Sequence, residues 1–350
     1  MSKMQTIGWD IGGAHLKAVL LGANGEVLRA LQLPCKLWLG LDQLEMAISK
    51  VLSTFNAPHA THAVTMTGEL VDGFANRLQG VQQIADCAVK SLGNQTQFYA
   101  GQASFVAHAQ VAKHAHNIAS ANWHASASLV AQHVPNALFV DIGSTTTDLI
   151  GIVNSQLQIA GYTDAQRLQT GELLYTGVVR TPLMALAKTI QFNQQNQHVA
   201  AEYFATTGDV YRLTDDLSEQ NYSSDTADGG AKTPAACAVR LARMVGWDAE
   251  QAALSTWVGL AQTYKSIQLN DFKMAISAQL MRFEGAAITL VFAGAGTFLA
   301  PSLMPHFAQC NLKAASEFII AKNSKLKALS SVCFPAFAVA ALLTFHQKNA

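Results

Sequence analysis

The chain has 350 residues, its 23 lysines and arginines are balanced by 23 aspartates and glutamates, and hydrophobic residues make up 50% of it. So apolar a chain can bury a large core, which excludes intrinsic disorder, and its length suggests two domains. The zero net charge and the pI near 7.2 exclude a nucleic-acid partner bound by phosphate neutralisation.

The first predicted elements form a three-stranded meander. Thr6–Ile11 is an apolar strand that ends in Asp10-Ile11-Gly12-Gly13, and a second strand follows at His15–Leu21. Asn24-Gly25 then separates the second strand from a third at Val27–Leu33. Asn-Gly between alternating apolar runs is a strong hairpin signal.

Residues 100–134, rich in alanine, serine and glutamine, read as helical and hold five histidines: His108, His114, His116, His124 and His133. A metal site and ordinary helix histidines both stay open. The chain's five cysteines are scattered without CxxC spacing, which favours reduced thiols over disulfides or zinc.

A second meander repeats the first. Leu138–Ile142 ends in Asp141-Ile142-Gly143-Ser144, and Asp141 lies 131 positions after Asp10. Strands at Asp148–Val153 and Leu157–Tyr162 follow, with Asn154-Ser155 as the turn between them. The matched spacing predicts an internal duplication.

Two segments after the repeat carry candidate substrate residues. In residues 167–181, Glu172 can be a general base or the cap of a helix that starts after Thr170-Gly171, and Tyr175 and Arg180 are substrate-binding candidates. Residues 202–229 hold seven of the chain's 23 acidic residues, and the overlapping stretch 218–233 reads as a loop. There Asp209 and Asp228 either bind the amine of a substrate or are merely solvated.

The last part of the chain has two uncharged apolar stretches. Residues 285–305 contain the strand Ile288–Phe292, the glycine turn at Gly294 and Gly296, and a helical segment from Thr297. Cys333–Phe345 is too short to span a bilayer, and the first residues of the chain show no apolar signal core. We therefore expect both stretches to be buried in a cytoplasmic protein without a membrane partner.

The glycine turns predict an anion site. Glycine leaves no Cβ between backbone amides and a phosphate, and Ser144, Thr145 and Thr146 add hydroxyl donors. Asp10 and Asp141 can hold a hydrated Mg²⁺. Lys17 lies in the strand after the first turn and is either a diphosphate ligand or a solvent-facing lysine. Two such turns in matched contexts favour a diphosphate clamp over ordinary hairpins.

The three-turn order resembles the superfamily of acetate and sugar kinases, Hsp70 and actin. The resemblance implies two duplicated ribonuclease-H-like α/β domains (the actin-like ATPase fold) that close over a nucleotide or phosphorylated ligand in an interdomain cleft. Gly12 and Gly13 match its first phosphate loop, Gly143 and Thr145 its second, and Gly294 and Gly296 its adenosine loop. The first turn departs at Ala14-His15, where the kinases often carry hydroxyl residues, so ATP stays open as a ligand.

Longer motifs narrow this resemblance to one family. GWDIGGAHLKA, LFVDIGSTTTDLI, TGELLYTGVVRTPLMAL and PAFAVAALL resemble the hydantoinase/oxoprolinase-like group linked to tetrahydromethanopterin-dependent one-carbon transfer. Archaeal relatives in that group make part of methanofuran. The resemblance implies a transferase that joins an aminomethyl-furanmethyl diphosphate to the phenol of a γ-glutamyl-tyramine or tyrosine-type unit and releases diphosphate. An ATP-dependent kinase or amidohydrolase and a non-catalytic nucleotide-binding regulator remain alternative functions. Assembly into a homo-oligomer is compatible with each of them.

Together these predictions give a first domain over 1–132 and a second over 133–330, with an insertion near 163–245. A C-terminal helix over 331–350 is expected to pack back on the first domain. The catalytic candidates are Asp10, Lys17, Asp141 and Glu172.

Overall fold

The computed structural model describes residues 5–283 and 287–349. The ends of the predicted domains at 1–4 and 350, and the first two residues of the apolar stretch 285–305, lie outside the described residues. The chain divides into two compact units, the first made of 1–135, 152–157 and 314–350 and the second of 136–151 and 158–313. The predicted domain boundaries and the insertion stay predictions.

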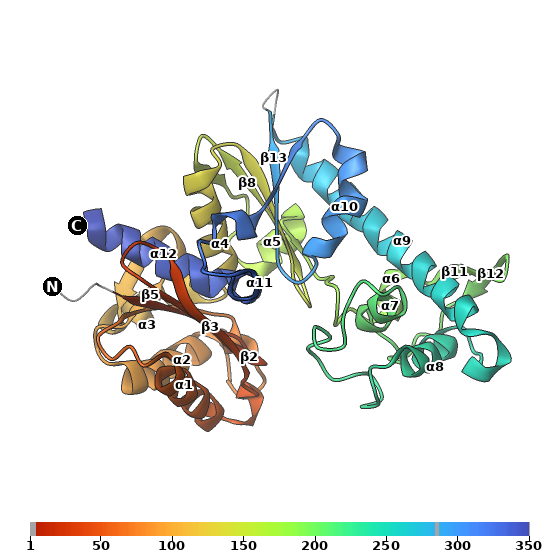
Figure 1. Cartoon of the computed structure of the whole chain (residues 1–350), viewed down its shortest axis with the longest axis horizontal. Helices are drawn as coiled ribbons and strands as arrows, with labels where there is room; N and C mark the ends of the chain where they lie inside the picture. The colour runs from red at the N-terminus through yellow and green to blue at the C-terminus, as the bar shows by residue number, and fades with distance from the viewer. Residues whose placement is uncertain (1–4, 284–286, 350) are drawn as a thin grey trace. The chain divides into compact units, whose positions relative to one another are not determined.

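The first unit is built on a six-stranded sheet in the order β3-β2-β1-β4-β5-β6 (Figure 1). β1 pairs antiparallel with β2 and parallel with β4. The strands are β1 (Thr6–Ile11), β2 (His15–Leu21), β3 (Val27–Pro34), β4 (Thr61–Met66), β5 (Gln97–Tyr99) and β6 (Phe105–Ala107). The first predicted meander is thus confirmed almost to the residue, because the turn residues and the alternation of apolar side chains specify it locally.

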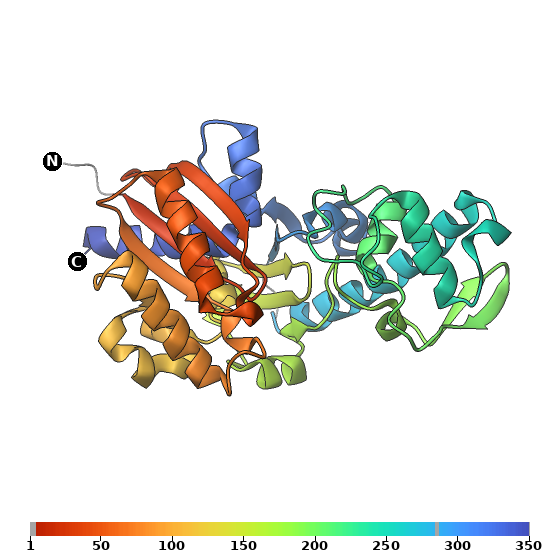
Figure 2. The same cartoon turned by 90° about the horizontal axis from the view of Figure 1, so that it is seen from below.

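Helices cover both faces of this sheet, as Figure 2 lets the reader follow. Ile7 and Trp9 of β1 pack in a core with side chains of α1 and α2, whereas a Cβ on Gly8 would lie 1.9 Å from the Ala336 carbonyl of α12. Successive strand residues face opposite sides, so α12 covers the other face. The helices are α1 (Leu41–Phe55), α2 (Arg77–Leu92), α3 (Val111–Ile118), α4 (Asn122–His133), α11 (Ser324–Val332) and α12 (Phe334–Asn349).

The second sheet repeats the strand order of the first. Its path is β10-β8-β7-β13-β14, β9 also pairs with β8, and β7 runs parallel to β13. The strands are β7 (Ala137–Ile142), β8 (Thr147–Val153), β9 (Gln156–Gln158), β10 (Leu173–Leu174), β13 (Thr289–Ala293) and β14 (Asn311–Ala314). When the strands along each path are numbered in chain order, both sheets contain five neighbouring strands in the order third, second, first, fourth, fifth. The duplication and the actin-like fold class with two ribonuclease-H-like sheets are confirmed.

The rest of the second unit has its own core. Phe192 stacks on Trp257 at 5.7 Å, and Trp257 lies on the long helix α9 (Leu254–Leu280). The other elements are α5 (Asp164–Thr170), α6 (Leu183–Leu186), β11 (Thr189–Phe192), β12 (Gln195–His198), α7 (Thr207–Leu213), α8 (Pro234–Met244) and α10 (Ala300–Leu303). Short 3-10 helices span Leu37–Leu39, Gly68–Leu70, Gly101–Ala103, His108–Gln110, Ala249–Gln251, Thr297–Leu299, Met304–Phe307 and Ala315–Phe318.

Three sequence predictions differ from this fold. Residues 100–134 are not one helical region, because β6 precedes α3 and α4. The strand expected over Leu157–Tyr162 is only β9, which ends at Gln158. No helix follows Thr170-Gly171; instead Gly171 ends α5 at a φ of 72°.

Among the described residues, no single helix is long and apolar enough to cross a membrane, whereas α11 and the adjoining part of α12 together meet that criterion with a 95° bend between them.

Candidate active site

The first glycine turn is tightly packed within its own unit. The Gly12 amide donates a 3.0 Å hydrogen bond to the His15 carbonyl, and a Cβ on Gly12 would stand 3.0 Å from that oxygen. A Cβ on Gly13 would lie 2.7 Å from Val71 Cγ1. The two glycines are therefore required by close approach, which keeps the edge of this turn backbone-only.

A second segment supports this turn and was not predicted from the sequence. After β4, the Thr67 amide donates to the Ile11 carbonyl at 2.9 Å, and Gly68 packs so closely that its Cβ would come 3.2 Å from the same oxygen. The signal in the sequence is the Thr-Gly that directly follows the apolar run Thr61–Met66. It corresponds in the fold to the glycines after β13.

Asp10 is the charged group of the first turn. It is 4% exposed, and Lys17 lies opposite it in the strand register with its Nζ 3.6 Å from Asp10 Oδ2. Asp10 Oδ1 is buried, and no residue in the described part of the chain forms a hydrogen bond with it. Burial raises the pKa of Asp10, and the charge of Lys17 offsets only part of that rise. Lys17 is 28% exposed and paired with Asp10, so it is not simply a solvent-facing strand lysine.

The second glycine turn has the same backbone as the first. The Gly143 amide donates to the Thr146 carbonyl at 2.8 Å, and a Cβ on Gly143 would again stand 3.0 Å from the accepting oxygen. Ser144, Thr145 and Thr146 are all half-buried. Asp141 precedes the turn at the end of β7 and is also half-buried.

Two other segments clamp the second turn. The Gly296 amide donates to the Ile142 carbonyl at 2.8 Å, and a Cβ on Gly294, whose φ is 83°, would lie 2.3 Å from Asp141 Oδ1. On the other side, the Arg180 amide donates to the Ser144 carbonyl at 2.9 Å, and a Cβ on Gly177 would lie 2.6 Å from the Gly143 carbonyl. Gly294 and Gly296 thus contact the turn, and their predicted role in ligand binding stays a prediction.

Gly177 belongs to one of the segments that contact the second turn, and this role was not predicted from the sequence. Its carbonyl accepts hydrogen bonds from Thr207 Oγ1 at 2.8 Å and from Gln268 Nε2 at 2.9 Å. The segment is thereby held from two directions. The signal was present as the small residues of Thr176-Gly177 in the motif that holds Arg180.

The position in the second meander that matches Lys17 is Asp148, and its partner is close. Arg167 Nη2 lies 2.6 Å from Asp148 Oδ1, and Arg167 is 1% exposed. Burial raises the pKa of Asp148, while the Arg167 charge and hydrogen bond act in the opposite direction. The second meander thus has an aspartate where the first has a lysine, and this aspartate is paired with an arginine of the same unit.

Comparison with known proteins places the chain in a family. The model of the hydantoinase/oxoprolinase family matches residues 60–343. The chain belongs to this family.

Two curated relatives carry one printed name, (4-{4-[2-(gamma-L-glutamylamino)ethyl]phenoxymethyl}furan-2-yl)methanamine synthase. The chain is 31% identical to the Methanocaldococcus jannaschii protein over 249 residues, which are 71% of this chain and 73% of that protein. It is 37% identical to the Methanococcus vannielii protein over 145 residues, 41% of this chain and 65% of that protein. A solved nucleotide-free acetone carboxylase covers 97% of this chain and 70% of its own at 9% identity with a TM-score of 0.57, a likeness of fold alone.

Glu172 does not have the surroundings of a general base. It is fully buried, and its carboxylate accepts hydrogen bonds from the Ala160 amide at 2.8 Å and the Gly161 amide at 3.0 Å. Arg282 adds an ion pair at 2.8 Å. A carboxylate with its oxygens so engaged and no exposed surface cannot reach a phenol, so the predicted base role is wrong. The predicted helix cap is wrong as well, since no helix begins there.

Asp209 is a structural anchor and not a substrate ligand. It is 0% exposed, accepts from Arg240 Nη2 at 2.7 Å and Nε at 2.9 Å, and also receives the Thr206 amide at the start of α7. This pairing satisfies a charge that would otherwise be buried alone. Its predicted substrate-binding role is therefore wrong, because its acceptors face the interior.

Asp228 lies on the outer side of the same cluster. Its Oδ1 is 3.1 Å from Arg240 Nη1, and the side chain is 34% exposed. Partial burial opposes ionisation, but the Gly230 amide and the charge of Arg240 outweigh it and lower the pKa of Asp228. Tyr175 and Arg180 are exposed, Tyr175 by 65%. Substrate binding by Asp228, Tyr175 and Arg180 stays a prediction.

A cation fits the first turn by one observation, the buried Asp10 Oδ1 without a hydrogen-bond partner. Across 5–283 and 287–349, no group of three or more His, Cys, Asp or Glu side chains is arranged to hold a metal. Such a cation would therefore take few protein ligands and complete its shell with water and ligand oxygens, as Mg²⁺ does.

Proposed function

We propose that this chain is a transferase that forms an ether between a phenol oxygen and a furanmethyl carbon, in the biosynthesis of a methanofuran- or methylofuran-type one-carbon carrier. The observation that carries the proposal is the 31% identity to the Methanocaldococcus jannaschii synthase across 73% of that protein. The printed name of that relative describes a phenoxymethyl-furan, which contains this ether bond.

The proposed donor is an aminomethyl-furanmethyl diphosphate, and the acceptor is a γ-glutamyl-tyramine or tyrosine-type phenol. The carbon–oxygen bond to diphosphate breaks, the phenol oxygen bonds to the same carbon, and the phenolic proton is released. Positive charge that develops on the carbon is shared by the furan oxygen. The protein then has to neutralise the leaving diphosphate and to hold the phenol in place.

The twin turns suit the first task. We assign the phosphate oxygens to these turns, where the half-buried hydroxyls of Ser144, Thr145 and Thr146 supply donors. We assign Mg²⁺ to Asp10 and Asp141, with Lys17 as a further cation for the leaving group. A cytoplasmic reaction is part of this proposal. ATP is the alternative ligand of the same turns.

The test is an assay with furanmethyl diphosphate and γ-glutamyl-tyramine, with and without Mg²⁺, that follows ether by mass spectrometry and diphosphate by ³¹P NMR. Ether and diphosphate are expected in equal amounts, and chelation of Mg²⁺ is expected to stop both. ATP with a small amide or hydroxyl substrate serves as the comparison. Hydrolysis of ATP without formation of ether would replace the transferase by a kinase or amidohydrolase.

A further inference from the structure

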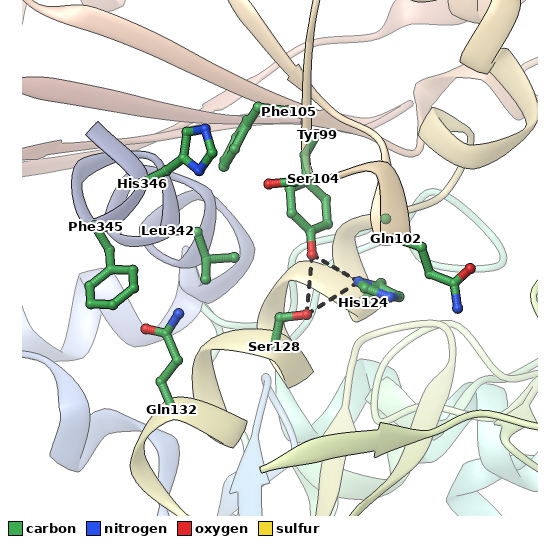
Figure 3. A pocket seen from close by; sticks show the side chains of 11 residues that line it. Tyr99, Gln102, Ser104, Phe105, His124, Ser128, Gln132, Leu342, Phe345 and His346 are labelled. Carbon is green, nitrogen blue, oxygen red and sulfur yellow. Dashed lines mark hydrogen bonds between the residues drawn. The ribbon is translucent and has the colours of Figure 1, made fainter. Parts of the chain in front are cut away.

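A cavity of about 330 Å³ lies within the first unit, away from any role assigned above. It is formed by β5, β6, α4 and the end of α12, and Figure 3 shows the side chains that surround it. A volume of this size is at the lower end of the range of small-molecule sites. The described part of the chain contributes no Asp, Glu, Lys or Arg to its lining, so a neutral ligand suits it.

The polar part of the cavity is a triangle of hydrogen bonds. Tyr99 Oη lies 2.8 Å from His124 Nδ1 and 3.1 Å from Ser128 Oγ, and Ser128 Oγ lies 3.3 Å from His124 Nδ1 (Figure 3). Tyr99 and His124 are buried at 3% and 7% exposure. Burial raises the pKa of Tyr99 to about 12, so its hydroxyl keeps its hydrogen at neutral pH.

The hydrogen bonds within the triangle determine which donors and acceptors remain free for a ligand. We assign the hydrogen of His124 to Nε2, so that Nδ1 accepts and the hydrogens of both hydroxyls are taken up by bonds among the three groups. The oxygens of Tyr99 and Ser128 keep lone pairs for a further partner. With Nδ1 as an acceptor, a group that completes this site donates a hydrogen bond.

The rest of the lining combines apolar and aromatic side chains with the polar side chains of Gln102, Ser104, Gln132 and His346. Phe105 packs edge-on against Tyr99 at 5.3 Å between ring centres, and Leu342 and Phe345 of α12 close the side across from them (Figure 3). Phe345 is 55% exposed. Flat apolar walls of this kind suit an aromatic ring.

We propose that this cavity is a binding site for a neutral phenol, whose ring lies between Phe105 and Phe345 and whose hydroxyl donates to the Tyr99–His124–Ser128 triangle. The inference stands on the cavity alone and does not need the proposed function. A phenol can reach it from two sources, the acceptor substrate of the transfer or a separate aromatic effector.

The test is a ligand-observed NMR titration of the full chain with 4-methylphenol and with its methyl ether, 4-methylanisole. The phenol is expected to bind about 3–10-fold more tightly, because only it can donate a hydrogen bond. Ser128→Ala removes one acceptor while the buried Tyr99–His124 bond remains, and should reduce that advantage. Phe345→Ala should weaken both ligands. Tyr203→Ala, a 47% exposed aromatic in the other unit, is the matched control.

Thermal melts of the variants show whether each is folded. Absence of phenol binding by the unmodified chain, or binding that both Ser128→Ala and Phe345→Ala leave unchanged, would overturn the site. A raised KM for a phenolic acceptor in Ser128→Ala identifies the cavity as the acceptor site; weakened phenol binding with an unchanged KM identifies an effector site. If no ether forms at all, the transferase proposal fails, whereas the titration still decides the cavity.

Discussion

The two glycine turns contain the same backbone hydrogen bond, but their units differ in how the buried carboxylates are paired. In the second unit, Asp148 lies 2.6 Å from Arg167, and the fully buried Asp209 lies 2.7 Å from Arg240. In the first unit, Lys17 lies 3.6 Å from Asp10, and none of the described residues gives Asp10 Oδ1 a hydrogen bond. A buried carboxylate with an unused oxygen costs stability. The buried aspartates of unit two are thus paired at short distance, whereas Asp10 of unit one is paired more loosely, which is why we propose Asp10 as the ligand of a cation.

The largest effect is expected from the buried pair of the second unit. Arg240→Met removes the partner of Asp209 and leaves a buried carboxylate uncompensated, which should lower the free energy of unfolding by about 3–5 kcal/mol. Chemical denaturation measures this loss. Arg243→Ala is the control on the same helix: its guanidinium is 46% exposed and 3.7 Å from Asp228, so at most about 1 kcal/mol should change. Equal losses would remove the distinction between buried and exposed charge.

Asp10→Asn should remove activity without loss of the fold. If Asp10 holds the cation at the leaving diphosphate, kcat for diphosphate release should fall about 10²–10³-fold. Asp141→Asn should act alike, because it is assigned to the same cation. Asp225→Asn, at an exposed position in the acidic loop, is the control and should keep full activity. Full activity in Asp10→Asn would end the assignment of a cation to the first turn.

Gly294 and Gly25 have the same φ of 83°, so alanine substitutions at the two positions distinguish the cost of backbone strain from the cost of steric contact. Gly294→Ala places a Cβ 2.3 Å from Asp141 Oδ1, whereas Gly25→Ala meets nothing within 4 Å. Both substitutions incur a left-handed backbone cost of about 1–2 kcal/mol, and Gly294→Ala should add about 1–3 kcal/mol of overpacking. Thermal and chemical unfolding of the pair give the difference. Indistinguishable stabilities would mean that the second turn is not tightly clamped.

The smallest expected effect is a gain in stability in the inactive variant. The pKa of Asp10 is raised above its ordinary 3.8 in the folded chain, so stability falls as pH rises from about 3.8 through the folded value. Asp10→Asn lacks this loss and should be more stable than the unmodified chain at neutral pH. The gain should vanish as the pH is lowered below 3.8, which denaturation at several pH values can follow. A variant that is less stable at pH 7 would show that the carboxylate is well solvated or paired.

The sequence predicts the twin meanders because their determinants are local. Asn24-Gly25 sets one hairpin, and the glycines after Asp10 and Asp141 set both turns. It does not predict the support of those turns by Gly68 and Gly177, because these come from segments joined only by the tertiary fold. Gly68 follows a parallel strand, and Gly177 follows a strand of two residues.

The failures at Glu172 and Asp209 have a common cause. A carboxylate in a polar segment reads as exposed, and nothing local shows that Arg282 or Arg240 will bury it. Glu172 lies 110 positions before its arginine and Asp209 lies 31 before its own. Ion pairs at such separations depend on the packing of α8 and α9, which alternation and turn signals do not specify.

The central claim is that the twin turns bind the leaving diphosphate through a cation. It is tested most directly by isothermal titration of the unmodified chain, Asp10→Asn and Asp141→Asn with diphosphate in the presence and absence of Mg²⁺. We expect Mg²⁺-dependent binding by the unmodified chain that each variant loses. Diphosphate binding that is equally tight in both variants, or that is indifferent to Mg²⁺, would contradict the claim.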